Sequence, residues 1–101
     1  MTNGARFDEL IHPATRLSVV ALLAAADWAD FAFVRDQLGL SDSALSKQLA
    51  TLEEAGYVTI ERPLSERRRR VRARLTQVGR ERFAGHVTAL REIISSSAQD
   101  T

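Results

Sequence analysis

The chain has 101 residues, of which 45% are hydrophobic and 27% charged, as expected for one ordinary globular domain spanning residues 1–101. It contains no cysteine, which excludes disulfides, thiolate metal ligands and thiol redox sensing. The longest apolar run, residues 19–26, is too short to cross a bilayer, and residues 1–8 lack the apolar core of a signal peptide. We therefore expect a cytoplasmic location without membrane association.

Charge is sorted unevenly along the chain, although the formal net charge is only +1. Between Glu61 and Leu75 there are seven arginines against two glutamates, a local excess of +5. The residues upstream are correspondingly acidic. Such sorting indicates that one surface meets a polyanion.

The first third of the chain predicts a helix and a connector. Pro13 favours the first position of a helix, and residues 14–26 then carry apolar side chains at helical spacing, within a first element expected over residues 10–26. This helix is apolar enough to be buried on two sides. Residues 27–32 predict a connector or a single extended pairing, with Trp28 and Phe31 expected to fill the core.

Residues 33–56 predict two helices joined by a tight turn. Residues 33–38 form a short helix that Gly39 ends. Ser41 then caps a further helix over residues 42–55, which Gly56 ends. Its inward positions follow the i, i+4, i+7 spacing: Leu45, Leu49 and Leu52.

After Gly56 the hydrophobic period changes from 3.6 to 2. Residues 57–60 are strong strand formers, and the alternation of arginine with apolar residues over 70–75 is typical of a half-buried strand. The two strands predict a hairpin over residues 57–75 with residues 64–69 between them. Thr76 is placed to cap a last helix over residues 77–95.

The order of elements and the local motifs resemble a known family. The run LGLSDSALSKQLATLEEAGYVTIER resembles the recognition-helix segment of the MarR and ArsR families of bacterial regulators, and RRRRVRARLTQVGRERF resembles the MarR-type wing strand and the segment after it. The resemblance covers roughly residues 10–95 and is strongest for a small single-domain subgroup. It implies a winged helix-turn-helix, mainly α with a small β-hairpin wing, in a dimeric DNA-binding repressor or activator.

The helix over residues 42–55 is the expected reading element. With its leucines inward, a 100° step per residue turns small and polar side chains outward, which lets the helix approach base edges in the major groove. Lys47 is placed to reach a guanine or a phosphate, and Gln48 an adenine. The alternative is an ordinary solvent-facing helix surface. The candidate DNA-binding residues here are Ser41, Ser43, Ala44, Ser46, Lys47, Gln48 and Thr51.

The hairpin supplies the second set of candidate contacts. Guanidinium groups suit phosphate because their planar fork donates two hydrogen bonds at once, and a loop arginine also fits the minor groove. The alternative is a solvated charged edge that discourages strand pairing between molecules. The candidates are Arg67, Arg68, Arg69, Arg70 and Arg72.

The last helix predicts a homodimer. Its apolar seam is longer than a monomer of this size easily covers. A two-fold dimer would place two reading helices about 34 Å apart on a palindromic operator. The alternative is that this helix closes its own core through Val78, Phe83 and Val87. The candidate interface residues are Leu10, Ile11, Phe83, Val87, Leu90 and Ile94.

Other classes of site find little support in the sequence. His12 and His86 are too few and too far apart to predict a metal site, and we expect no cofactor. No catalytic constellation is present, so we do not expect an enzyme. A protein-interaction module without DNA binding is the alternative function, because winged helices also bind proteins. The operator, the sign of regulation and any small-molecule effector cannot be read from the residues.

Overall fold

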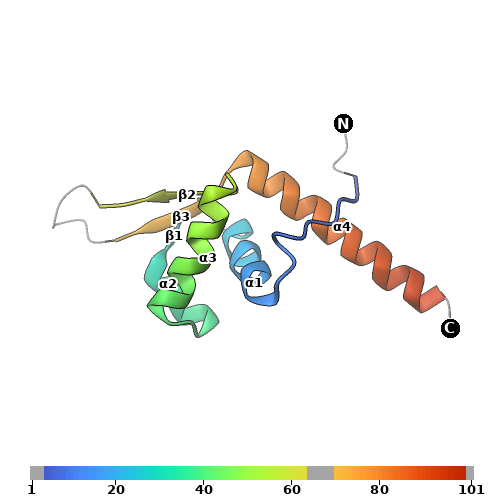
Figure 1. Cartoon of the computed structure of the whole chain (residues 1–101), viewed down its shortest axis with the longest axis horizontal. Coiled ribbons are helices and arrows are strands. Elements are labelled where there is room, and N and C mark those ends of the chain that lie inside the picture. The colour runs from blue at the N-terminus through green and yellow to red at the C-terminus, as the bar shows by residue number, and fades with distance from the viewer. Residues whose placement is uncertain (1–3, 64–69, 100–101) are drawn as a thin grey trace.

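The computed structural model describes residues 4–63 and 70–99. Its elements follow the chain in this order: α1 (Ala14–Ala24), β1 (Ala29–Asp30), α2 (Phe31–Leu38), α3 (Asp42–Glu54), β2 (Val58–Glu61), β3 (Arg72–Leu75) and α4 (Gln77–Gln99) (Figure 1). The expected class, mainly α with a small β-hairpin wing, is confirmed.

The local signals end and begin helices where the sequence predicts. Gly39 takes a left-handed φ of 63° after α2, and Gly56 takes a φ of 82° after α3. Ser41 caps α3, because its Oγ accepts a hydrogen bond from the Ala44 amide at 3.1 Å. Thr76 caps α4 in the same way, accepting from the Gly79 amide at 3.0 Å.

Several helix boundaries differ from those predicted. α1 ends at Ala24 and not Ala26, and Pro13 is the residue before the helix. α2 begins at Phe31 and not at position 33, because β1 leads directly into it with Asp30 as its N-cap residue. α4 extends to Gln99, beyond the predicted residue 95, so the serine tract over 95–97 is helical.

The three strands form one antiparallel sheet in the order β1-β3-β2. β2 and β3 are the predicted hairpin, with Val58 opposite Leu75 and Glu61 opposite Arg72. The connector over residues 27–32 makes a single extended pairing, one of the two outcomes expected for it: β1 pairs with β3 and places Ala29 opposite Ala73. The hairpin loop, residues 64–69, lies outside the described residues.

A single core lies between the helices and the inner face of the sheet. α1, α3, β2 and β3 contribute most of its buried side chains, among them Leu23, Leu45, Leu52 and Leu75. The start of α4 packs closely against Tyr57 beside this core. A Cβ added at Gly79 would overlap the Tyr57 carbonyl oxygen. Phe83 packs on the core, whereas Val78 is 44% exposed and does not.

α4 is much longer than the body that it covers. Its C-terminal half projects away from the other helices, and the N-terminal segment runs across it (Figure 1). The amide of Arg6 donates to the Gly85 carbonyl at 2.9 Å at this crossing. An added Cβ on Gly85 would lie 3.3 Å from the Arg6 side chain, so the strap would have to shift slightly to accept a larger residue there. We call residues 4–12 the N-terminal strap.

Candidate nucleic-acid interface

α3 presents a leucine face inward and a polar face outward, as the sequence predicts. Leu45, Leu49 and Leu52 are buried. Of the candidate contact residues, Ser41, Ser43, Ser46 and Lys47 are exposed, while Ala44, Gln48 and Thr51 are half-buried. The Thr51 hydroxyl donates back to the Lys47 carbonyl at 3.1 Å, so this side chain lies close to the helix backbone.

An arginine fixes the turn between α2 and α3. Arg35, near the end of α2, donates from Nε to Asp36 at 2.9 Å and from Nη1 to Asp42 at 2.8 Å. The hydrogen bond to Asp36, and then that to Asp42, raises the pKa of the Arg35 guanidinium. Because Asp42 is the first residue of α3, this bridge joins the end of α2 to the start of α3. Arg35 was not among the residues expected at this surface.

The flank of α3 is tied to α1. Arg16 donates from Nε to the Gln48 Oε1 at 3.0 Å and from Nη1 to the Leu10 carbonyl at 2.8 Å. Gln48 was expected to reach an adenine. Its side chain is instead held from behind.

The described wing arginines are paired with acidic residues of their own chain. Arg70 lies 3.5 Å from the Asp30 carboxylate, Arg74 lies 3.1 Å from Asp27, and the Arg72 Nε donates to Glu61 at 2.9 Å. These carboxylates come from the connector, β1 and β2. The described wing arginines therefore carry less unpaired charge than the local excess of +5 in the sequence suggests.

Trp28 lies against these arginines. The guanidinium carbons of Arg72 and Arg74 are 4.6 and 5.2 Å from the centroid of its ring. Trp28 was expected to fill the core, and this prediction is wrong, because the ring covers the outer face of the sheet. Phe31, in contrast, packs against the core as expected. Arg67, Arg68 and Arg69 lie outside the described residues.

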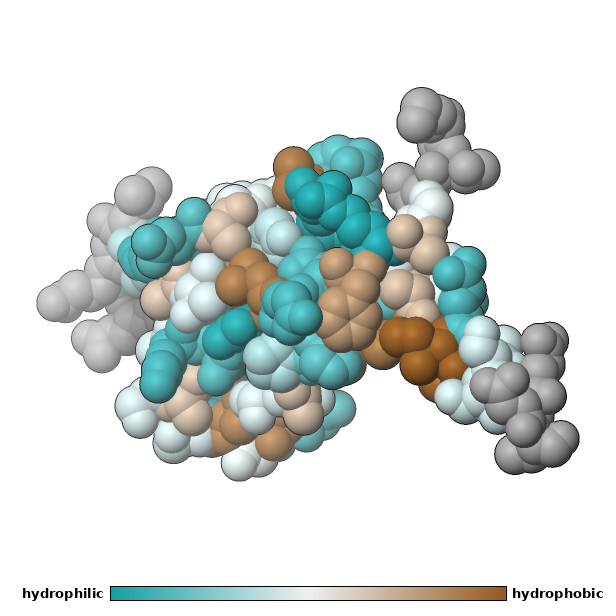
Figure 2. Space-filling view, turned by 45° about the vertical axis from the view of Figure 1, so that its right-hand side comes forward, coloured by the Kyte–Doolittle hydropathy of each residue, from teal (hydrophilic) through white to brown (hydrophobic). Residues whose placement is uncertain are grey.

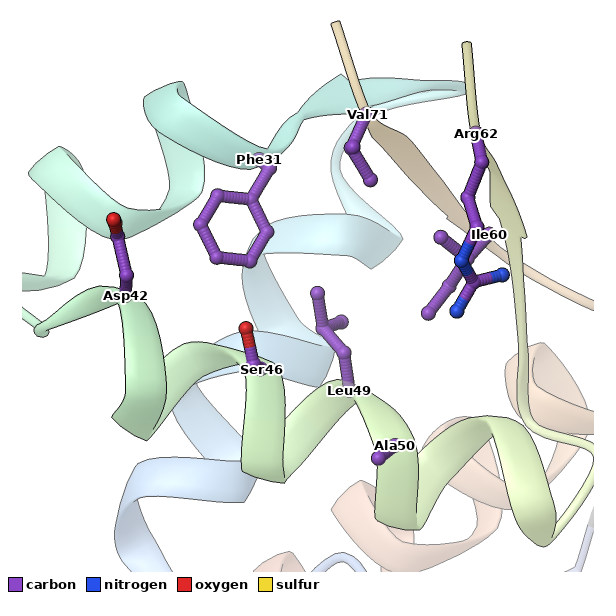
Figure 3. Close-up of a pocket in the computed structure, with 8 residues that line it drawn as sticks. All are labelled: Phe31, Asp42, Ser46, Leu49, Ala50, Ile60, Arg62 and Val71. Atoms are coloured by element: carbon purple, nitrogen blue, oxygen red, sulfur yellow. The ribbon is translucent and has the colours of Figure 1, made fainter. Parts of the chain in front are cut away.

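A hollow of about 350 Å³ separates α3 from the wing. Its walls converge from α2, α3, β2 and the start of β3, and most of the converging side chains are apolar (Figure 3). The lining residues are Phe31, Asp42, Ser46, Leu49, Ala50, Ile60, Arg62 and Val71. Arg62 reaches back to Glu53 at 3.4 Å along the rim. α3 and the hairpin thus form two sides of this hollow.

The residues expected at a dimer interface divide into two groups. Ile11 is 0% exposed and belongs to the core of its own chain, so its assignment to an interface is wrong. Leu10, Phe83, Val87 and Leu90 are half-buried, and Ile94 is 67% exposed beside Ile93 at 53%. Figure 2 shows a strongly apolar patch next to the C-terminal end of the chain.

The N-terminal strap is held by a polar cluster that the sequence did not reveal. His86 is 0% exposed, and its Nδ1 accepts a hydrogen bond from the Asp8 amide at 3.0 Å. Because a backbone N–H can only donate, neutral His86 has its proton on Nε2, which faces the His12 Nδ1 at 3.4 Å. The two histidines, 74 positions apart, are therefore neighbours in space.

Asp8 joins this cluster to the end of α3. Its carboxylate accepts from the Leu10 amide at 2.9 Å and from the Tyr57 hydroxyl at 2.6 Å. Burial, and then the proximity of His12, lower the pKa of His86. Burial, together with the bond to Asp8, raises the pKa of Tyr57.

Residues 4–63 and 70–99 contain no group of three or more side chains that could hold a metal ion. Within the same ranges, no helix has the length and hydropathy of a membrane span.

Comparisons with known proteins agree with this geometry. The sequence profile of the winged helix DNA-binding domain matches residues 15–94. An uncharacterized protein of Methanocaldococcus jannaschii, MJ0432, is 25% identical over 79 residues, which make up 78% of this chain and 86% of that protein.

Solved structures share the fold. A transcriptional regulator homologue from Pyrococcus horikoshii OT3 superposes with a TM-score of 0.82 at 21% identity, covering 88% of each chain. Reduced AbfR bound to DNA gives a TM-score of 0.69 at 24% identity, covering 77% of this chain and 54% of AbfR. The resemblance to winged-helix transcriptional regulators expected from the sequence is confirmed.

Proposed function

Because this chain belongs to the family of winged helix DNA-binding domains, we propose that it is a sequence-specific regulator of transcription that binds double-stranded DNA as a homodimer. In this proposal α3 enters the major groove, and the arginine wing contacts phosphate or the minor groove. Bound over a promoter, such a dimer acts as a repressor. We assign the chain no catalytic step and no cofactor.

The observation that supports this proposal best is the exposed face of α3. Its leucines are buried, so Ser43 and Lys47 project from a helix whose outer surface carries no bulky apolar side chain. The bridge from Arg35 to Asp42 fixes this helix against α2. A rigid helix with short polar side chains fits the major groove, where each base pair presents a distinct pattern of donors and acceptors.

The wing contributes affinity in this proposal, and its arginines are not equivalent. Arg70 is 83% exposed, and its contact with Asp30 is long at 3.5 Å, so a phosphate displaces that carboxylate easily. Arg72 is more strongly held, between Glu61 and the Trp28 ring. We therefore infer that Arg70, together with Arg67, Arg68 and Arg69 of the loop, makes the main phosphate contacts, and that Arg72 contributes less.

The homodimer is inferred from α4. Leu90, Ile93 and Ile94 lie on the projecting half of this helix, where a second copy would cover them. Phe83 and Val87 continue the seam toward the body, and the half-buried Leu10 of the strap is the remaining candidate. AbfR, which shares the fold, has been solved bound to DNA. A two-fold dimer would present two α3 helices to two half-sites of a palindrome.

The test is selection of bound sequences from a random duplex library, followed by binding measurements by fluorescence anisotropy at several salt concentrations. Arg70→Ala is expected to weaken binding to all duplexes about equally and to reduce the salt slope by about one unit. Ser43→Ala or Lys47→Ala is expected to change the preferred sequence. Arg91→Ala is the matched control, because Arg91 is an exposed arginine on α4, away from α3 and the wing.

The alternative of a protein-interaction module makes the opposite prediction. Such a module would show no duplex binding that fades as salt rises, and no enrichment of any sequence. If the chain binds duplex DNA but Arg70→Ala leaves the affinity unchanged, the assignment of the wing is wrong. A monomer at the concentration that saturates the operator, measured by light scattering, would contradict the homodimer.

A further inference from the structure

The amide of Gln48 is engaged before any DNA arrives. Arg16 reaches it from α1, across 32 positions in the sequence, with an Nε–Oε1 distance of 3.0 Å in a partly buried setting. The same guanidinium is anchored by the Leu10 carbonyl at 2.8 Å. Leu10 is in turn held by the Asp8 carboxylate, which accepts from its amide at 2.9 Å. Gln48 therefore sits at the end of a chain of contacts that begins in the N-terminal strap.

The chemistry of arginine fixes which way the amide points. A guanidinium has five N–H donors and no acceptor, so the atom that faces Arg16 must be the carbonyl oxygen of the side chain. The NH₂ group of Gln48 consequently points away from Arg16. A glutamine without such a partner can turn either end of its amide outward.

The two purines make different demands on a glutamine. Adenine offers an acceptor at N7 and a donor at N6, so a paired contact needs both the oxygen and the NH₂ group of the amide. Guanine offers two acceptors, N7 and O6, and needs only donors. Held in this orientation, with its oxygen toward Arg16 and its NH₂ group turned away, Gln48 matches guanine better than adenine.

We propose that Arg16 is a positioning residue that presents Gln48 as a hydrogen-bond donor, so that the chain reads guanine at the base pair facing Gln48. This inference rests on the proposed function and replaces the adenine contact expected from the sequence. Arg16 does not itself touch the base. It sets the specificity of α3 by holding the Gln48 carbonyl oxygen toward α1, so that the NH₂ group is the end of the amide left to face a base.

The experiment compares the motifs that four proteins enrich from one random-sequence duplex library: wild type, Gln48→Ala, Arg16→Met and Arg16→Lys. In the wild type we expect guanine at one position of each half-site, with a discrimination of roughly 5- to 150-fold, the range for a good paired base contact. Gln48→Ala removes the preference at that position alone. Arg16→Met frees the amide oxygen and brings adenine up to at least equal guanine there, whereas Arg16→Lys still donates and retains guanine.

Two further variants provide an independent test of the Gln48 contact and a control. Gln48→Glu keeps the pairing with Arg16 but has no donor, so it loses the guanine preference even if Arg16→Met fails to fold. Gln77→Ala is the matched control, since this glutamine lies at the start of α4 and bonds Glu81; its motif is expected to equal that of the wild type. Thermal unfolding of each variant separates loss of fold from change of motif.

The outcomes distinguish this inference from the function on which it rests. If no protein enriches any duplex, the proposed function fails and the inference with it. If the wild type enriches a motif and Gln48→Ala leaves every position unchanged, only the inference fails. Adenine at the Gln48-dependent position of the wild type, or an Arg16→Met motif identical to that of the wild type, also overturns it.

Discussion

Lowering the pH is expected to destabilise the chain through His86. This side chain is 0% exposed, and its Nδ1 accepts the Asp8 amide, so protonation would set a second N–H against that donor. Burial, and then the proximity of His12, lower the pKa of His86 in the folded state. The unfolded state therefore binds the proton first, as the pH falls below about 6.5, the ordinary value for histidine. The contribution to stability is complete above that pH and declines below it.

The size of this effect follows from linkage. In a pH range where the unfolded chain binds the proton and the folded chain does not, each pH unit costs at most about 1.4 kcal/mol. Several charged groups surround His86: Asp8, Glu9 and His12 act on it electrostatically, and Arg6 and Arg82 act on Tyr57, which also bonds Asp8. A variant is therefore needed to isolate the part due to His86.

The assay is urea unfolding between pH 5.5 and 7.5 at one fixed protein concentration, so that any self-association is constant. His86→Gln provides the isolating variant, because its amide oxygen can still accept the Asp8 amide but does not titrate. We expect the decline of stability below pH 6.5 to be largely absent in this variant and mostly retained in His12→Ala. An equal pH slope in the wild type and His86→Gln, or stability that rises on acidification, would refute the reasoning.

Three other predictions test the fold and the assembly. Gly79→Ala should lower the free energy of unfolding by roughly 1–3 kcal/mol, because the new methyl group overlaps the Tyr57 carbonyl. The loss should exceed that of Gly85→Ala in the same helix, because the closest contact of a Cβ at Gly85 is 3.3 Å. Removing the α3 cap with Ser41→Ala should cost about 1 kcal/mol in chemical unfolding, and no loss would mean that the cap is not formed in solution. Replacing Ile93 and Ile94 with aspartate should shift a dimer to a monomer in light scattering, with Val78→Asp, at the other end of α4, unchanged.

The elements that sequence reasoning placed correctly depend on local signals. Leu45, Leu49 and Leu52 define the buried face of α3 by their spacing, whatever they pack against. Gly39 and Ser41 end one helix and begin the next through conformations and hydrogen bonds that lie within four residues. The hairpin follows from the change of period after Gly56. Each of these features is determined by neighbours along the chain.

The features that were missed depend on contacts between distant residues. Nothing near Arg70 or Arg74 indicates that Asp30 and Asp27 neutralise them, since that requires β1 to pair with β3. Ile11 looks like part of an exposed seam until the strap folds it into the core. A signal did exist for the crossing of the strap. A glycine inside a helix, here Gly85 next to His86, is often a site of close backbone approach, and it could have predicted that another segment crosses α4 there.

The strap also links α4 to α3, and Tyr57→Phe tests that link. This change removes one hydroxyl, whose 2.6 Å hydrogen bond to the Asp8 carboxylate is charge-assisted, and should cost about 1.5–3 kcal/mol in unfolding. Asp8 positions Leu10, whose carbonyl anchors Arg16 behind Gln48. A looser strap should therefore weaken the guanine preference proposed for Gln48 and leave the other positions of the enriched motif unchanged. If Tyr57→Phe loses stability but enriches the same motif with the same discrimination, the strap holds the fold together without setting what α3 reads.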